Sequence, residues 1–213
     1  MIAETVEQTL NGGFLGLYGE VVTEDTYKLK SLKFVPDAIL DLGANVGIFT
    51  RYASSLFPLA KIISVEPDSG NFIHLTKFTH PKNTVFLNKA IGTGSVYHLP
   101  GAENGAHEKY VSVGVGDYRS GQETNIETIM LDELVNRYTM PWDFVVLKCD
   151  IEGNEVVLWD HKPSLDAMRK IDYIAMETHW WEKERRNLVL ESFRETHDCE
   201  ISEYLFYATK KVL

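Results

Sequence analysis

The chain has 213 residues, 44% of them hydrophobic, which is enough for one globular domain with a full core. Its formal net charge of −10 disfavours a nucleic acid partner. Its longest apolar runs are too short to span a membrane, and residues 1–13 lack the apolar stretch of a secretory signal. Cys149 and Cys199 form no CxxC motif, so we expect neither a zinc site nor a disulfide framework, and we expect a reducing cytoplasm.

Apolar runs and helical spacing alternate along the chain. They predict strands at 38–43, 61–67, 84–92, 144–150 and 171–179, and helices at 47–57, 69–79, 154–165 and 182–196. Residues 199–211 indicate two short strands or a hairpin. Strands that alternate with helices predict an α/β fold, with a doubly wound, mostly parallel sheet and right-handed crossovers.

Individual residues add further expectations for two of these helices. Pro163 is expected to end or kink the helix predicted at 154–165. In the last helix Leu188, Val189 and Phe193 are expected to face the core.

The predicted domain covers residues 1–213, and two of its segments match no motif. Residues 1–37 are expected to form an N-terminal helical or cap segment. Residues 93–143 contain glycines between short β-like runs, so we expect a β-rich insert or lid over one edge of the site. These segments are where we expect the choice of substrate to lie.

The loop 41–47, DLGANVG, follows the first predicted strand. In an open α/β sheet, ligands bind beyond the carboxyl ends of the strands, so this loop is a candidate binding site. Gly43, Asn45 and Gly47 tolerate left-handed backbone conformations and permit close approach of a ligand. Asp41 would repel a pyrophosphate but attract a cation. The loop therefore favours S-adenosylmethionine (SAM), whose sulfonium and ammonium groups are both positive.

The next two predicted strands supply further candidate ligands for SAM. Glu66 ends the second strand, where an acid accepts hydrogen bonds from both ribose hydroxyls of an adenine nucleoside. Asn88 lies where the adenine edge would be, and Ala90 and Ile91 are placed to pack on the ring. Asn88 fits a turn residue equally well.

Five segments together resemble the FkbM-type methyltransferases, a branch of the class I SAM-dependent enzymes: ILDLGANVGIFT, VEPD, NKAIG, TIMLDELV and VLKCDIEGNEVVL. The resemblance covers about residues 38–179. It implies a Rossmann-like, seven-stranded class I sheet with an antiparallel C-terminal strand, and most often O-methylation of sugar or polyketide hydroxyls. The family's cofactor motif matches Asp41, Gly43, Asn45, Gly47 and Glu66, and its signature after the fourth strand matches Lys148, Asp150 and Glu152.

Lys148, Asp150 and Glu152 end the fourth strand, which adjoins the SAM methyl group in such a sheet. Lys148 and Asp150 alternate onto one face, with Cys149 on the other. Asp150 can take the proton of an acceptor hydroxyl, which typically contributes about 10² to 10⁴ in rate. Glu152 either assists or complements the dipole of the next helix. Lys148 either neutralises Asp150 or orients an acceptor oxygen.

Glu177 and His179 end the fifth strand and are expected to face the same crevice. His179 is an alternative base because its ordinary pKa is near neutral. Together with Asp150 and Glu152 these groups offer mainly oxygen ligands to Mg²⁺. We nevertheless expect no metal in the favoured interpretation.

The expected activity is SAM-dependent O-methylation of a hydroxyl on a sugar or another small molecule, a glycan being one candidate. The sequence does not indicate an oligomeric state. One alternative is an N-methyltransferase of a peptide or amine. Another is an NAD-dependent oxidoreductase, which the acidic loop and the missing GxGxxG disfavour. Trp180 and Trp181 fit either stacking on a sugar or packing at a helix entry.

Overall fold

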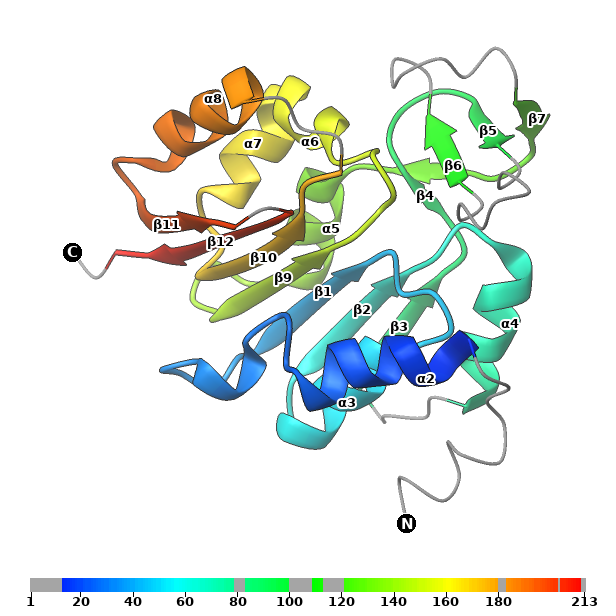
Figure 1. Ribbon diagram of the computed structural model, residues 1–213, viewed down its shortest axis with the longest axis horizontal. Coiled ribbons are helices and arrows are strands. Elements are labelled where there is room, and N and C mark those ends of the chain that lie inside the picture. The colour runs from blue at the N-terminus through cyan, green and yellow to red at the C-terminus, as the bar shows by residue number, and fades with distance from the viewer. Residues whose placement is uncertain are drawn as a thin grey trace.

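The computed structural model describes residues 13–78, 83–99, 109–112, 121–179, 183–202 and 204–211. Figure 1 shows a twisted central sheet with helices on both faces and a small separate sheet beside it. The seven strands of the central sheet lie in the order β11-β12-β10-β9-β1-β2-β3. Their bounds are β1 (Ala38–Leu42), β2 (Lys61–Val65), β3 (Thr84–Leu87), β9 (Val145–Cys149), β10 (Tyr173–Glu177), β11 (His197–Ile201) and β12 (Leu205–Lys210).

The strand order reverses beside β1. The strands β1, β2 and β3 run outward to one side, and β9 then returns to the other side of β1, parallel to it. β12 is antiparallel to both β10 and β11, so a hairpin closes the sheet. Every residue of β1 and β9 is buried, as expected for central parallel strands covered on both faces. The carboxyl ends of β1 and β9 meet at the reversal, where Asp41 lies in register with Lys148.

The helices divide between the two faces of this sheet. An N-terminal segment lies over one face with α3, and the other face carries α5 to α8 (Figure 1). The bounds are α2 (Gly13–Tyr18), a π-helix (Gly19–Thr23), a 3-10 helix (Leu29–Ser31), α3 (Ile48–Leu56), α4 (Ser69–Phe78), α5 (Leu131–Tyr138), α6 (Val156–Asp160), α7 (Lys162–Met168) and α8 (Lys183–Phe193). Among the described residues, no helix is both long and apolar enough to cross a bilayer.

The predicted strands and helices are confirmed, with bounds that shift by a few residues, except at 84–92. The expected single strand is broken there. β3 ends at Leu87, and β4 (Ala90–Ile91) pairs instead with β8 (Thr128–Ile129). The Asn88 side chain donates to the backbone oxygens of Glu66 and Pro67, at 2.8 and 3.0 Å, and so holds the turn between the two strands.

Two helix predictions need correction. Pro163 lies in the first turn of α7, where the missing backbone N–H leaves no helical hydrogen bond unmade, so it begins a second helix. The expected core position of Leu188 is wrong, because this side chain is 71% exposed while Val189 and Phe193 are buried. Consecutive helical residues are rotated by about 100°, so Leu188 cannot share a narrow buried stripe with Val189.

The stretch 93–143 contains the small sheet of Figure 1, formed by β5 (Val96–Leu99), β6 (Lys109–Ser112) and β7 (Gln122–Thr124). Both pairings are antiparallel. Residues 100–108 and 113–120 lie outside the described residues. A lid role for this insert stays a prediction.

Gly43→Ala tests the close packing at the reversal of strand order. A Cβ at Gly43 would lie 1.7 Å from the carbonyl oxygen of Asp150, and the φ of +78° disfavours any other residue. We expect the variant to unfold at lower urea concentration, with a loss of about 1 to 3 kcal/mol or more. Gly16→Ala is the control. Nothing lies within 4 Å of that position, so stability should hold or rise by about 0.5 to 1 kcal/mol. Equal stabilities of the two variants would contradict this account of the junction.

Candidate cofactor-binding and methyl-transfer site

The loop after β1 turns sharply in a left-handed conformation. Gly43, Asn45 and Gly47 have φ values of 78°, 50° and 91°. The Asn45 side chain accepts a hydrogen bond from the Val46 N–H at 2.7 Å, and the Gly43 N–H donates to Val65 at 3.0 Å. The glycines and the asparagine thus occupy the positions where the backbone requires them.

Glu66 lies after the end of β2 and contacts this loop. Its carboxylate accepts hydrogen bonds from the backbone N–H groups of Asn45 and Asp68, at 2.8 and 2.9 Å. Burial raises the pKa of Glu66 to about 7, and the two N–H donors and the charge of Lys148 oppose that rise. A ligand hydroxyl that donates to this carboxylate would favour its ionised form.

A cavity of about 330 Å³ opens above these two loops. Its wall includes the predicted residues Gly43, Asn45, Glu66, Asp150 and Glu152, together with Ala90 and Ile91. Asp68, Asn71 and Asn154 also line it, and the sequence did not single them out. Asp68 accepts a hydrogen bond from the Asn71 N–H at 2.6 Å, and the Asn154 side chain donates to the Ile91 carbonyl oxygen at 2.8 Å, contacts that no spacing in the sequence reveals.

The other three predicted cofactor residues do not line this cavity. Asp41 is fully buried beneath the loop, where its carboxylate accepts from the Thr50 hydroxyl at 2.6 Å. Gly47 caps α3, and Asn88 donates to the carbonyl oxygens of Glu66 and Pro67. These residues shape the loops around the cavity, and a ligand would meet their neighbours first.

Lys148 is a buried cation that contacts both the loop after β1 and the loop after β9. Its ammonium donates to the carbonyl oxygens of Gly43 and Leu42, at 2.6 and 3.3 Å. It also pairs with Asp41 at 3.4 Å and with Asp150 at 3.8 Å. Burial opposes this charge, but the carboxylates, led by Asp41, hold the pKa of Lys148 above its ordinary value. Lys148 therefore stays charged and joins the two loops.

Asp150 is the partly open carboxylate of this network, with 23% of its side chain exposed. Burial raises the pKa of Asp150 to about 7. Lys148 and His179 lower it, and Glu177 and Glu152 raise it. A carboxylate with a pKa near neutral can both lose and accept a proton under ordinary conditions.

His179 lies among carboxylates. Its Nδ1 is 3.0 Å from Glu155 and its Nε2 is 3.2 Å from Glu177. Burial lowers the pKa of His179, but the bonds to Glu155 and Glu177 outweigh that effect and raise it to about 10. His179 is thus a cation at neutral pH, which favours Asp150 over it as the base. Its role as the alternative base stays a prediction.

Glu155 and Tyr27 belong to the same network, and the sequence reading missed both. Glu155 is fully buried and accepts from the Ile151 N–H at 3.0 Å as well as from His179. The Tyr27 hydroxyl lies 3.3 Å from Asp150 and 3.2 Å from Glu177. Glu155 is the second acid of the segment EGNE and could have been singled out from the sequence. Nothing in the sequence around Tyr27 marks that residue.

Asp150, Glu155 and His179 could hold a metal ion, since each offers a ligand atom within 4.8 Å of the others. This set differs from the predicted Mg²⁺ ligands, which included Glu152 and Glu177 in place of Glu155. Both ring nitrogens of His179 already contact carboxylates, so a metal would have to displace one of those contacts. We keep the expectation that no metal is needed. Trp180 and Trp181 lie outside the described residues.

The model of the methyltransferase FkbM domain matches residues 41–198, more than half of the chain. The chain belongs to the FkbM methyltransferase family. Its members are SAM-dependent methyltransferases, so SAM is the cofactor, and the oxidoreductase alternative is set aside.

One solved structure shares the fold of this chain, and two further proteins share a short stretch of its sequence. A candidate rRNA methylase of Clostridium thermocellum superposes with a TM-score of 0.50 at 9% identity, over 96% of this chain and 98% of its own. The AMB antimetabolite synthetase AmbE of Pseudomonas aeruginosa is 36% identical over 52 residues, and the methyltransferase sdnD of Sordaria araneosa is 39% identical over 51. Each alignment covers 24% of this chain, but only 2% and 19% of those two proteins.

The raised pKa of Glu66 predicts how SAM binding depends on pH. On the prediction that ribose hydroxyls donate to the ionised carboxylate, binding should strengthen as pH rises through about 7. We expect roughly a 10-fold gain in affinity between pH 6 and pH 8, measured by calorimetry. Glu66→Gln keeps the shape but cannot ionise, so its gain in affinity over this range should be smaller, leaving only the titrations of SAM and of Asp150. Parallel curves for the two proteins would remove Glu66 from the ribose site.

Proposed function

We propose that this protein transfers the SAM methyl group to a hydroxyl of a small molecule, with Asp150 as the general base. The observation that carries the proposal is the partly exposed Asp150 carboxylate, which lines the cavity and has a pKa near 7. Glu66 lines the same cavity from the end of β2. SAM, held by Glu66, and the base Asp150 can therefore lie in the same cavity.

The cavity wall suits the parts of SAM in turn. Glu66 accepts from the ribose hydroxyls, and Ala90 and Ile91 offer an apolar surface to the adenine ring. The loop at Gly43 and Asn45 lines another part of the cavity, where the amino acid end of SAM would lie. The sulfonium then lies toward Asp150, so that its methyl group faces the base.

The reaction needs little from the protein beyond alignment and a proton acceptor. The acceptor oxygen attacks the methyl carbon in line with sulfur, so an O–C bond forms as the S–C bond breaks and its electron pair returns to sulfur. The hydroxyl proton passes to Asp150. Holding the two reactants in line can lower the barrier further.

Charge supports a neutral or cationic acceptor over an anionic one. Asp150, Glu152 and Glu177 are carboxylates near the cavity, while Lys148 is already paired with the buried Asp41. Carboxylates accept hydrogen bonds from sugar hydroxyls and repel phosphates. A sugar or glycan therefore fits, and a nucleic acid does not.

N-methylation of an amine is the second candidate, and the same carboxylates favour it because they attract an ammonium group. Labelled SAM incubated with a metabolite extract distinguishes the two candidates. A product with the label on oxygen supports our proposal. A product with the label on nitrogen would replace it with the second candidate.

Asp150→Asn tests the base. The amide keeps the shape and hydrogen bonding but cannot take a proton, so turnover should fall by about 10² or more. SAM affinity and melting temperature should stay near those of the unaltered protein. Asp166→Asn, at an exposed carboxylate of α7, is the control and should keep full turnover. Near-normal turnover of Asp150→Asn would sink the assignment and make His179→Ala the next variant.

Chelation tests the expectation that no metal takes part. Added EDTA should leave methyl transfer within about two-fold of the untreated rate, since proton transfer to Asp150 needs no Lewis acid. The measurement is label transfer before and after dialysis against the chelator. If EDTA abolishes transfer and Mg²⁺ restores it, then Asp150 and His179 should be reassigned as metal ligands.

A further inference from the structure

Tyr27 reaches the site from a part of the chain that the family does not cover. It lies on the N-terminal segment, outside the matched residues 41–198. The residue is 2% exposed, and its hydroxyl contacts Asp150 Oδ2 at 3.3 Å and Glu177 Oε1 at 3.2 Å. Its single phenol proton thus faces two carboxylates at once.

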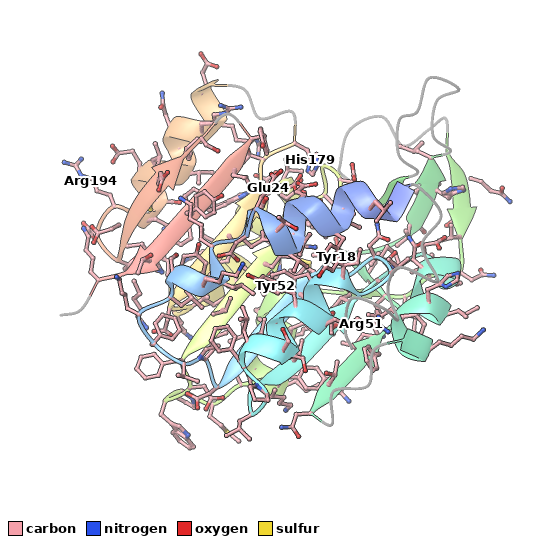
Figure 2. All side chains as sticks on the ribbon, turned by 60° about the horizontal axis from the view of Figure 1, so that its bottom comes forward. Tyr18, Glu24, Arg51, Tyr52, His179 and Arg194 are labelled. Atoms are coloured by element: carbon pink, nitrogen blue, oxygen red, sulfur yellow. The ribbon has the colours of Figure 1, made fainter. Side chains whose placement is uncertain are left out.

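The segment around Tyr27 is held firmly against the body of the protein. Figure 2 shows it crossing in front of the central strands, with Tyr52 and His179 labelled on either side. The hydroxyls of Tyr52, Tyr207 and Tyr173 donate to the Asp25 carboxylate and to the backbone oxygens of Thr26 and Tyr27, at 2.8, 2.7 and 3.2 Å. The Tyr27 ring also packs edge-on against Phe49, with centroids 5.3 Å apart. The hydroxyl is therefore delivered to a fixed point.

We propose that Tyr27 is a positioning residue for methyl transfer, whose hydroxyl orients Asp150 through Oδ2 and hydrogen-bonds to its ionised form. The inference rests on the proposed role of Asp150 as the base. Tyr27 and Lys148 both lie at Oδ2, so Oδ1, which has His179 Nε2 at 3.9 Å, is the oxygen that we assign to the acceptor proton. Once Asp150 has taken that proton, the Tyr27 hydroxyl turns to Glu177, which stays ionised. The phenol keeps its own proton throughout, because burial and the facing carboxylates hold the pKa of Tyr27 far above its ordinary value.

The groups that face Asp150 come from four parts of the structure. They determine whether the pKa of Asp150 should rise or fall when the Tyr27 hydroxyl is removed. They are Lys148 on β9, Glu152 in the following loop, Glu177 and His179 at the end of β10, and Tyr27 from the N-terminal segment. Tyr27 is the neutral donor among them, so its removal changes no formal charge. A lost donor to the ionised form makes that form less favourable, so the pKa of Asp150 should rise.

Tyr27→Phe removes the hydroxyl and keeps the ring. With labelled SAM and the acceptor found as above, turnover at pH 7 should fall about 10-fold, as for the loss of one hydrogen bond to a charged group. The loss should shrink at pH 9, where Asp150 ionises without help, and SAM affinity should not change. Recovery with pH is not expected for a defect in packing alone.

Tyr52→Phe is the matched control. It too removes a phenol hydroxyl that donates to a carboxylate of this region, but that carboxylate is Asp25, outside the set that faces Asp150. It should leave the pH profile unchanged. Equal losses in both variants at every pH would show that Tyr27 only anchors the segment, and would overturn the inference.

A second measurement needs no acceptor. The carboxyl ¹³C signal of Asp150, assigned with Asp150→Asn, should titrate at higher pH in Tyr27→Phe than in the unaltered protein and in Tyr52→Phe. An unshifted titration overturns the inference whatever the acceptor is. If the unaltered protein labels no hydroxyl, only the proposed function is contradicted, so the two failures are distinguishable.

Discussion

The buried ammonium group of Lys148 is the interaction on which the site depends. It joins the carbonyl oxygens after β1, the buried Asp41 and the partly open Asp150 at the reversal of strand order. A buried charge is tolerated only when it is paired and hydrogen-bonded, and loss of one partner typically costs about 3 to 5 kcal/mol. The two loops therefore depend on each other through one side chain. Within this network, Asp41 is the buried carboxylate closest to Lys148, and Asp150 is the more distant and partly exposed one.

His179 and the carboxylates around it form a second network of charges, next to that of Lys148. Buried Glu155 holds His179 as a cation, and His179 in turn faces the carboxylates of Asp150, Glu152 and Glu177. The cation of His179 thus moderates the repulsion among these acids. Such a network holds its carboxylates close to the proposed site of proton transfer, while the surrounding strands remain apolar. Asp150, the proposed base, is a partly exposed acid, whereas the buried acids Asp41 and Glu155 hold the cations Lys148 and His179 in place.

The sequence predicted those parts of the site that follow local rules. Buried strands that end in an acid located Asp41, Glu66 and Asp150, because the carboxyl ends of parallel strands meet at one edge. Left-handed loop positions located Gly43 and Asn45 for the same local reason. The contact of Tyr27 with Asp150 joins residues 123 positions apart, and no periodic pattern reports such a contact.

The misplaced elements have similarly physical causes. The strand predicted at 84–92 has the right composition, but a tertiary hydrogen bond from Asn88 to the backbone of Glu66 breaks it. Leu188 belongs to an apolar run in which only one narrow stripe can be buried, and the run alone does not reveal which residue is left out. Both errors come from contacts between segments, which composition does not encode.

The docking of the N-terminal segment onto the closing hairpin has a consequence for biogenesis. Thr26 is bonded by Tyr207, and Lys28 pairs with Glu200, so these contacts join residues 181 and 172 positions apart. Contacts across so much of the chain form late and slowly during folding. On the ribosome, the segment that carries Tyr27 must wait without its partner until β12 has emerged. A nascent chain that already has the five parallel strands of the central sheet would therefore still lack the contacts that hold this segment in place.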